Sequence, residues 1–383
     1  MPADDFAPLL AELRRTAVER DKRGGHPAEE KALLQAAGLL RLSIPAQLGG
    51  DERPWPEIFA LVRRVATVDS ALAHLLAFHH LQVATLRIYG NDAQQSYWLG
   101  RTIAEGGWWG NAVNPLDAGL TAVAQPDGYL LDGRKGFCSG TRGSRFMTLT
   151  ARLADGSSVM GVVQTEQPGI VVHDDWDPIG QRQTDSGSVS FRQVLLRRAD
   201  VLRAHDAVPS AFHTLRNSFG QLILANLFVG IAIGARDEAR DFARTQARPW
   251  VASGVQRATE DPYTLQRFGE IHVQIAAAEA LTDRAATAIQ VAFERGPALN
   301  ERERAETAVA IAEAKVIAHR AGLFASQELF DVVGARGTHA SLGYDRFWRN
   351  VRTHTLHDPI DYKLAMLGRW ALNDEFPPPN MYT

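Results

Sequence analysis

The rest of the sequence is best interpreted from one segment, Gly334-Ala-Arg-Gly-Thr-His-Ala-Ser-Leu-Gly-Tyr-Asp-Arg-Phe-Trp-Arg-Asn-Val-Arg-Thr-His-Thr-Leu-His-Asp-Pro-Ile-Asp-Tyr-Lys363. Gly334 and Gly337 bracket Arg336, so backbone N–H groups and a guanidinium group could converge on one anion. The structural alternative is that Gly334 simply ends a helix, as glycine often does. The segment therefore predicts either an anion site or a helix end.

The second half of the segment predicts a joint between two helices. Arg349, Arg352 and His354 follow one another at helical spacing. The residue before a proline disfavours helix, so this helix is predicted to end near His357. Asp358 is then the predicted N-cap of the next helix. His357 could point from such a joint into a cleft, although two nearby histidines can also be ordinary packing residues.

Composition restricts the class of protein. The chain has 383 residues, of which 45% are apolar and 22% charged, with a net charge of −3. This usage is typical of globular domains, and the mixed charges argue against nucleic acid or a membrane as partner. A single cysteine, Cys138, excludes an internal disulfide, and no signal-peptide pattern is present at the N-terminus. We therefore expect a cytoplasmic protein.

Hydrophobic periodicity divides the chain into three predicted domains and an α+β class. Residues 1–107 are predicted to form an N-terminal helical domain, 108–205 a central β domain, and 206–383 a C-terminal helical bundle. Asp69 is a predicted N-cap. The predicted strands are Gly128–Leu131, Phe146–Ala151, Val159–Gln164 and Val189–Phe191, and the predicted long helices are Ser210–Gln246, Pro262–Arg295 and Arg302–Val333.

Small and polar residues gather in three loops of the central region: 107–111, 135–144 and 176–188. Each loop alone is more typical of a hairpin turn than of a site. Trp108 and Trp109 are core residues by default, and Cys138 is more typical of a small buried filler than of a nucleophile. The combination of these tryptophans with Asn111, Ser139 and Thr184 favours a planar cofactor.

Other kinds of site find little support in the sequence. It contains no G-x-G-x-x-G motif after a strand, no G-x-x-x-x-G-K-S/T loop and no G-x-S-x-G elbow. His354-x-x-His357 lacks a third ligand at a recognisable spacing, so no metal site is predicted.

The order of elements and these loops resemble the acyl-CoA dehydrogenase superfamily, in particular its flavin-dependent monooxygenase branch, typified by dibenzothiophene monooxygenases. The resemblance runs almost end to end. Its most specific strings are Gly180-Gln-Arg-Gln-Thr-Asp-Ser-Gly-Ser188, Thr245-Gln-Ala-Arg-Pro-Trp250, Ala258-Thr-Glu-Asp-Pro-Tyr263, Gly334-Ala-Arg-Gly-Thr-His339 and Arg349-Asn-Val-Arg-Thr-His-Thr-Leu-His-Asp-Pro359. It implies a fold with an N-terminal helical domain, a central β-barrel or sandwich and a C-terminal helical bundle, in which residues 206–383 serve flavin binding and oligomerisation.

The resemblance also implies the chemistry. In this branch FMN, reduced to FMNH2 by a separate NADH-dependent flavin reductase, reacts with O2 to give a C4a-hydroperoxyflavin that oxygenates a small organic substrate. Asn111 and Ser139 would contact the flavin, His357 would be the acid/base, and His74 matches a further site residue. The carboxylate base of true acyl-CoA dehydrogenases is missing at the corresponding place.

Further assignments follow from the same resemblance. Arg336 and Gly337 would hold the FMN phosphate, with Arg267 as a second phosphate ligand. Trp176 and His354 would also contact the cofactor, and Phe78, Trp108 and Phe137 would contact the substrate. The protein would be a homotetramer. Phe78 stands where the dibenzothiophene enzymes have tyrosine, and the 114–119 segment is shorter than their substrate-covering loop, so the substrate is left open.

The predicted function is a two-component FMNH2-dependent monooxygenase for an organosulfur or aromatic heterocyclic substrate. One alternative is an FAD-dependent acyl-CoA dehydrogenase, which would retain FAD and be bleached by acyl-CoA. An alternative of another class is a non-catalytic flavin-binding protein.

Overall fold

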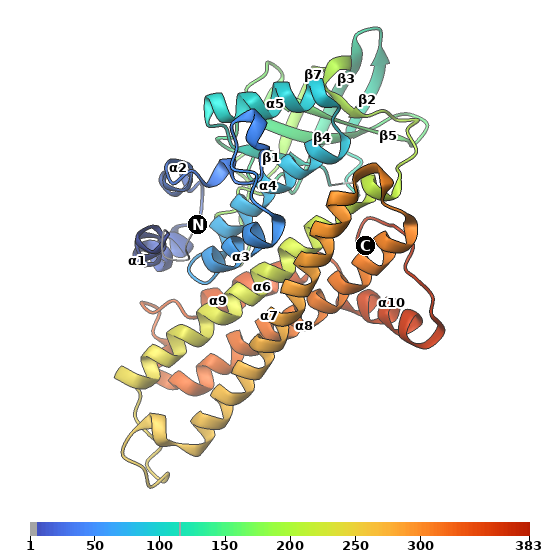
Figure 1. The fold of residues 1–383 in the computed structure, drawn as a ribbon. Helices are drawn as coiled ribbons and strands as arrows, with labels where there is room; N and C mark the ends of the chain where they lie inside the picture. Colours follow the sequence, from blue (N-terminus) through green and yellow to red (C-terminus); the bar gives the residue numbers. More distant parts are fainter. Residues whose placement is uncertain (1–5, 115) are drawn as a thin grey trace.

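The computed structural model describes residues 6–114 and 116–383, which fold into three parts in chain order (Figure 1). The first part is helical, the second is a β-sheet, and the third is a bundle of long helices. The helices of the first part are α1 (Ala7–Arg23), α2 (Ala28–Ala36), α3 (Trp55–Ala66), α4 (Ser70–Tyr89) and α5 (Asp92–Glu105). The last part contains α6 (Ala211–Thr245), α7 (Pro262–Arg295), α8 (Glu301–Val333), α9 (Asp345–Thr355) and α10 (Ile360–Asn373). The predicted α+β class is confirmed, whereas the domain boundaries stay predictions.

Side-chain caps explain where several helices begin. The Asp69 carboxylate accepts the backbone N–H groups of Ala71 and Leu72, as predicted, and so fixes the start of α4. Asn91 and Asn300 form capping boxes at α5 and α8, and Asp261 caps α7. These caps satisfy N–H groups that have no partner within the helix.

The middle part is one curled sheet. Its strands are β1 (Trp109–Ala112), β2 (Leu120–Gln125), β3 (Gly128–Lys135), β4 (Phe146–Arg152), β5 (Ser158–Gln164), β6 (Ile170–Val172), β7 (Val189–Arg197) and β8 (Val201–Arg203). The strand order is β6-β7-β3-β2-β4-β5-β8, and β1 pairs in parallel with β4. One face of the sheet encloses its own apolar core, which includes Leu131, Leu149 and Phe191. The parallel pairing sets Asn111 beside Thr148.

The first and last parts of the chain share a single hydrophobic core. This core joins residues of α1 and α3, such as Leu13 and Phe59, to residues of α6 and α8, such as Phe228 and Ala318. Figure 1 shows α6, α7 and α8 side by side, with the sheet at one end of the bundle. The most apolar window of α6 is long enough to cross a membrane, but 89% of it is buried inside the protein. This helix is therefore the central core helix of the fold.

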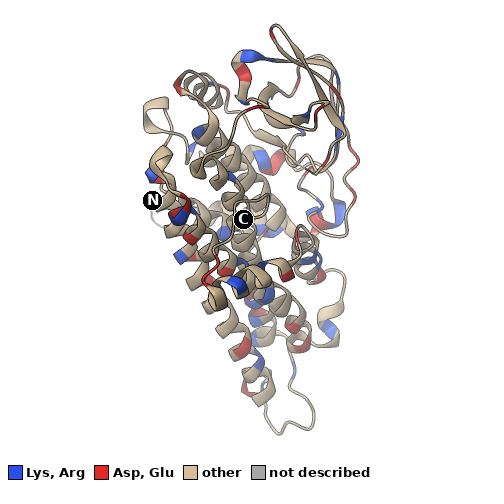
Figure 2. Ribbon diagram, turned by 90° about the vertical axis from the view of Figure 1, so that its right-hand side faces the viewer, with Lys and Arg blue, Asp and Glu red and all other residues tan. Residues whose placement is uncertain are grey.

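Acidic and basic residues alternate along the helices, as the red and blue segments of the ribbon in Figure 2 show. Many form ion pairs on exposed surfaces, such as Arg302 with Glu306. Other ion pairs are deeply buried, among them Arg20 with Asp69, Arg20 with Glu30, and Lys315 with Asp358. Buried charges require such partners because desolvation is costly.

Candidate active site

One face of α4 carries a row of aromatic and polar side chains. His74, Phe78 and Gln82 are four residues apart, and Thr85 follows three residues later, so all four lie on one helical face. The His74 ring stacks on Phe78 with ring centres 4.0 Å apart, and on His354 of α9 with ring centres 4.8 Å apart. The structure thus brings His74 and His354 together, although they are about 280 residues apart in the chain.

The two stacked imidazoles are held neutral and lack hydrogen-bond partners. Burial lowers the pKa of His74 well below its usual value, and nearby His354 and His357 lower it further. Burial, helped by His357 and Lys315, lowers the pKa of His354 to about 3. Both ring nitrogens of His74 and Nδ1 of His354 are buried without a partner. Such groups are rare in folded proteins and point to a ligand with hydrogen-bonding edges.

Asn111 lies opposite this row, on β1. Its side-chain oxygen accepts hydrogen bonds from Gln82 Nε2 at 3.2 Å and from Arg216 at 3.3 Å. Its backbone N–H donates to the carbonyl oxygen of Ser139 at 2.9 Å, so these two predicted flavin contacts are neighbours. The Ser139 hydroxyl in turn bonds to that of Ser186 at 2.7 Å. The 135–144 and 176–188 loops therefore meet beside Asn111, which belongs to the third loop, 107–111.

His357 lies at the predicted joint between α9 and α10, but the joint is built differently from the prediction. Asp358 is not the N-cap of α10. Pro359 occupies that position, and no side chain caps the helix. The Asp358 carboxylate is instead buried between Lys315 and His357, whose Nδ1 lies 2.9 Å from Asp358 Oδ1. An ammonium group is a stronger partner for a buried carboxylate than backbone N–H groups, and this explains the difference.

Lys315, Asp358 and His357 form a series of polar contacts that leads from the core to the surface. Burial alone would raise the pKa of Asp358, but hydrogen bonds from His357 and Lys315 outweigh it and hold that pKa well below its usual range. The His357 side chain is 48% exposed. Unlike the buried, neutral His74 and His354, His357 contacts an ionised carboxylate and reaches the surface.

Phe137, Trp176 and Trp108 have different environments. Phe137 has a positive φ of 55° and is 66% exposed, and its ring meets that of Trp176 edge-on at 5.9 Å. The Trp176 indole N–H donates to the Gln181 carbonyl oxygen at 2.9 Å. Trp108, by contrast, is 5% exposed and packs against His79 in the helical core. Trp108 thus contacts His79, whose side chain leaves α4 about 100° around the helix from that of Phe78.

The predicted phosphate ligands lie far from Asn111 within one chain. Arg336 donates to the carbonyl oxygen of Gln246, the C-cap of α6, whereas Arg216 near the start of α6 bonds to Asn111. About 30 residues of helix separate Arg216 from Gln246, which corresponds to about 45 Å. Arg267 pairs with Glu328 at 2.6 Å, near the same end of the bundle as Arg336. A single chain therefore does not unite the two groups of predicted site residues.

Gly337 is buried, and a Cβ atom there would lie 2.0 Å from Val333 Cγ2, so the position requires glycine. Its backbone N–H already donates to the Gly334 carbonyl oxygen at 2.9 Å. Gly334 itself has a φ of 64° and ends α8. Gly334 thus has the helix-ending role considered above, close packing explains the glycine at position 337, and the Arg336 side chain, which bonds to the Gln246 carbonyl oxygen, stays the predicted anion ligand.

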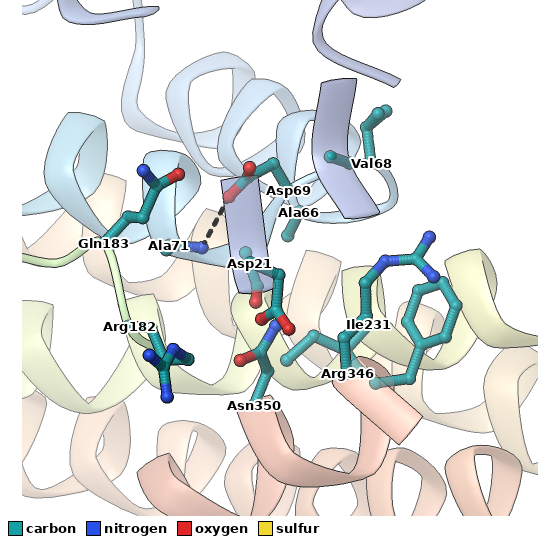
Figure 3. Close-up of a pocket in the computed structure, with 13 residues that line it drawn as sticks. Asp21, Ala66, Val68, Asp69, Ala71, Arg182, Gln183, Ile231, Arg346 and Asn350 are labelled. Carbon is teal, nitrogen blue, oxygen red and sulfur yellow. Dashed lines mark hydrogen bonds between the residues drawn. The ribbon is translucent and has the colours of Figure 1, made fainter. Parts of the chain in front are cut away.

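A small cavity of ≈20 Å³ lies where α1, α4, α6 and α9 meet (Figure 3). Asp21, Asp69, Gln183 and Asn350 are among the residues that line it. It has room for about one water molecule. The cavity marks the place where α9 is joined to the 176–188 loop. Asn350 Oδ1, on α9, accepts a hydrogen bond from the backbone N–H of Gln181 at 2.6 Å.

Two parts of the site were missed by the sequence reasoning. Arg216 and Gln82 lie within long apolar helical segments. From the sequence alone, a polar residue in such a segment that faces the site cannot be distinguished from one that faces solvent. Lys315 was missed for the same reason. The 114–119 segment singled out above includes Pro115, which lies outside the described residues, so its role as a cover remains a prediction.

The comparisons with known proteins agree with this architecture. Residues 7–106 match the acyl-CoA dehydrogenase N-terminal domain, and residues 222–362 match the C-terminal domain of the same family. The chain is 44% identical over 378 residues to the probable FMNH2-dependent monooxygenase SfnC of Pseudomonas putida, which covers 98% of this chain and 95% of that protein. It is 40% identical to the dibenzothiophene monooxygenase of Mycolicibacterium goodii, over 99% of this chain and 95% of that protein.

Solved structures show the same likeness. Methanesulfinate monooxygenase MsuC from Pseudomonas fluorescens superposes with a TM-score of 0.97 at 42% identity, over the full length of both chains. FMN-bound TdsC from Paenibacillus sp. A11-2 gives a TM-score of 0.95 at 34% identity, over 99% of both chains. The chain therefore belongs to the acyl-CoA dehydrogenase family, within its branch of flavin-dependent monooxygenases that use FMNH2.

Proposed function

We propose that this monooxygenase oxygenates a small organosulfur compound, using FMNH2 that a separate NADH-dependent flavin reductase supplies. Two of the relatives named above are a dibenzothiophene monooxygenase and a methanesulfinate monooxygenase, and both of these compounds contain sulfur. The observation that carries the proposal is the stacked pair of His74 and His354, whose three unpartnered nitrogens lie between α4 and α9.

These residues fit a flavin. The isoalloxazine ring is planar and carries donors and acceptors along its edge, which would satisfy the unpartnered imidazole nitrogens. Asn111 and Ser139 offer further polar contacts from β1 and from the loop after β3. When bound, FMNH2 supplies the two electrons that activate O2 for transfer to the substrate. The protein excludes water from this region, since Asn111 is 9% exposed and His74 is 4% exposed.

We assign the proton-transfer role to His357. Asp358 accepts a hydrogen bond from Nδ1 of His357 and would stabilise its protonated form, while Lys315 keeps Asp358 ionised. Nε2 of His357 would then be the atom that gives a proton to the oxygen atom of O2 that is released as water. His354 and His74, being neutral, would position the flavin rather than protonate it.

The wide separation of Arg336 from Asn111 supports assembly as a homotetramer. Arg336 and Arg267 could reach a flavin phosphate only if a second copy of the chain brought them there. This is tested by mixing subunits. An Arg336→Ala protein and a His357→Ala protein, each poorly active alone at limiting FMNH2, should gain activity after joint unfolding and reassembly, because some sites then receive both intact residues. Mixtures that stay inactive would contradict the shared site.

The oxygenation itself is tested with FMN, NADH, O2, purified reductase and an organosulfur substrate. We expect product only when reductase is present, and also when a dialysis membrane separates the two proteins, since FMNH2 can diffuse. Turnover by this chain alone with NADH and FMN would contradict the two-component proposal. A yellow chain that retains FAD and is bleached by acyl-CoA would support the dehydrogenase alternative instead.

A further inference from the structure

Arg216 is an arginine without a carboxylate partner in the candidate site. Its Nε donates to the Thr85 hydroxyl at 3.0 Å, and one terminal nitrogen donates to Asn111 Oδ1 at 3.3 Å. A guanidinium group has five N–H donors, so most remain unused by these two bonds. Among residues 6–114 and 116–383, no carboxylate lies within ion-pair distance of Arg216, and no nitrogen of Arg216 is both buried and unpartnered. Its free donors therefore reach accessible space.

A second arginine adds to the positive potential. Arg203 on β8 donates to Ser158 at 3.0 Å, but its Nε is buried without a partner. Burial lowers the pKa of Arg216 to about 10, nearby Tyr89 raises it, and Arg203 lowers it. Two neighbouring cations without an acidic partner are costly to bury, so an anionic ligand would relieve the cost.

We propose that Arg216 binds the anionic group of the substrate, and that the substrate is a compact organic sulfinate. This rests on the proposed function, because it names the substrate of the same site. Arg346 and Arg63 are compensated by Glu238 and Asp283. Among the residues that the structure describes, buried Arg304 also lacks an acidic side chain as partner, but its guanidinium group bonds to Thr214 and to the Thr383 carbonyl oxygen. Arg216 differs from these arginines because it bonds to Asn111, a predicted flavin contact.

The position of Arg216 restricts the distance between the charge and the reacting atom. Because Arg216 bonds directly to Asn111, an anion that it binds lies beside the predicted flavin contact. The charged group and the oxidised atom must then be the same or adjacent. A sulfinate meets this requirement, since its sulfur carries both the charged oxygens and the lone pair that is oxygenated. The reaction balances as RSO2⁻ + O2 + FMNH2 giving RSO3⁻ + FMN + H2O.

The test uses two probes of nearly equal size and shape, methanesulfinate and neutral dimethyl sulfoxide. FMN binding by the full chain is first measured from quenching of FMN fluorescence. The rise in Tm of the FMN-loaded protein with probe concentration, at constant ionic strength, then gives each Kd. We expect methanesulfinate to bind at least about 10-fold more tightly than dimethyl sulfoxide, as is usual for hydrogen bonds to a charged group.

Substitutions of Arg216 test whether this residue causes the preference for methanesulfinate over dimethyl sulfoxide. Arg216→Gln should weaken methanesulfinate binding about 10- to 100-fold and leave dimethyl sulfoxide unchanged, and Arg216→Lys should fall between, since it keeps the charge but loses the planar fork. Arg87→Gln is the matched control, because Arg87 is on the same helix as Thr85 but pairs with Glu52. Equal binding of the two probes, or an unchanged methanesulfinate Kd in both Arg216 variants, would overturn the proposal. Failure to bind FMN would instead contradict the proposed function.

Discussion

The Lys315→Met substitution should strongly destabilise the protein, because it leaves the Asp358 carboxylate buried without its cation. The side chains of Lys315 and Asp358 are 2% and 4% exposed, and Lys315 also donates to Gln221 Oε1 at 2.5 Å. Removing one member of a buried pair costs about 3–5 kcal/mol, since the remaining charge has been desolvated without compensation. We expect the free energy of unfolding at pH 7, measured by urea denaturation, to fall by about that amount.

Two comparisons make this measurement specific. The double variant Lys315→Met/Asp358→Asn removes both charges and should recover most of the loss. Arg302→Met breaks the exposed Arg302–Glu306 pair, whose side chains are 67% and 54% exposed, and should cost about 0.5 kcal/mol or less. If Lys315→Met costs no more than Arg302→Met, or if the double variant is no more stable than the single one, the reasoning is refuted.

The pH dependence of the stability provides a second test of this prediction. Without Lys315, burial should raise the pKa of Asp358 above its value in the unfolded chain. The folded state of Lys315→Met then binds more protons than the unfolded state. The difference in stability between this variant and the natural protein should therefore shrink as the pH is lowered from 7 to 5.

Three further predictions concern other residues. His357→Ala should still bind FMNH2 but lose product formation by about 10²–10⁴-fold, with the electrons diverted to hydrogen peroxide, which is checked from the ratio of product to peroxide; a variant that melts early yet stays fully coupled would end this assignment. Arg336→Ala should weaken FMNH2 binding by about 1.5–3 kcal/mol in the assembled oligomer, and an unchanged Kd would leave Arg336 only its bond to Gln246. Burial lowers the pKa of His79 from 6.5 to about 4, so the unfolded chain binds more protons between these pH values, and this group alone should lower the stability by about 2 kcal/mol from pH 7 to 5. His79→Gln should show a correspondingly shallower acid dependence in urea denaturation, and an unchanged slope would contradict the assignment.

Much of the fold was predictable because local signals agree with the tertiary structure. The predicted helix Pro262–Arg295 has the observed bounds of α7, since Asp261 caps its start and Gly296 ends it. The strand prediction Phe146–Ala151 falls one residue short of β4. Strand pairing was not predictable, because the parallel contact of β1 with β4 depends on how the sheet curls and not on local sequence.

The site was predictable where the resemblance supplied the residues and not where tertiary contacts decide. Asn111 and Ser139 were identified, and the structure makes them neighbours. The Asp358 cap was wrong because the ammonium that takes its carboxylate is on α8, more than 40 residues earlier in the chain. Arg216 gave no signal, since the absence of an acidic partner becomes visible only after folding.

The shared core of the first and last helices has a consequence for synthesis on the ribosome. The apolar faces of α3 and α4 are covered by α6, which begins about 120 residues after α4 ends. At typical translation rates of about 5–20 residues per second, these faces wait for about 6–24 s before their partner emerges. The β-sheet has its own core and can close during that interval. Nascent chains should therefore be most prone to aggregation, and most dependent on chaperones, while the middle third of the message is being translated.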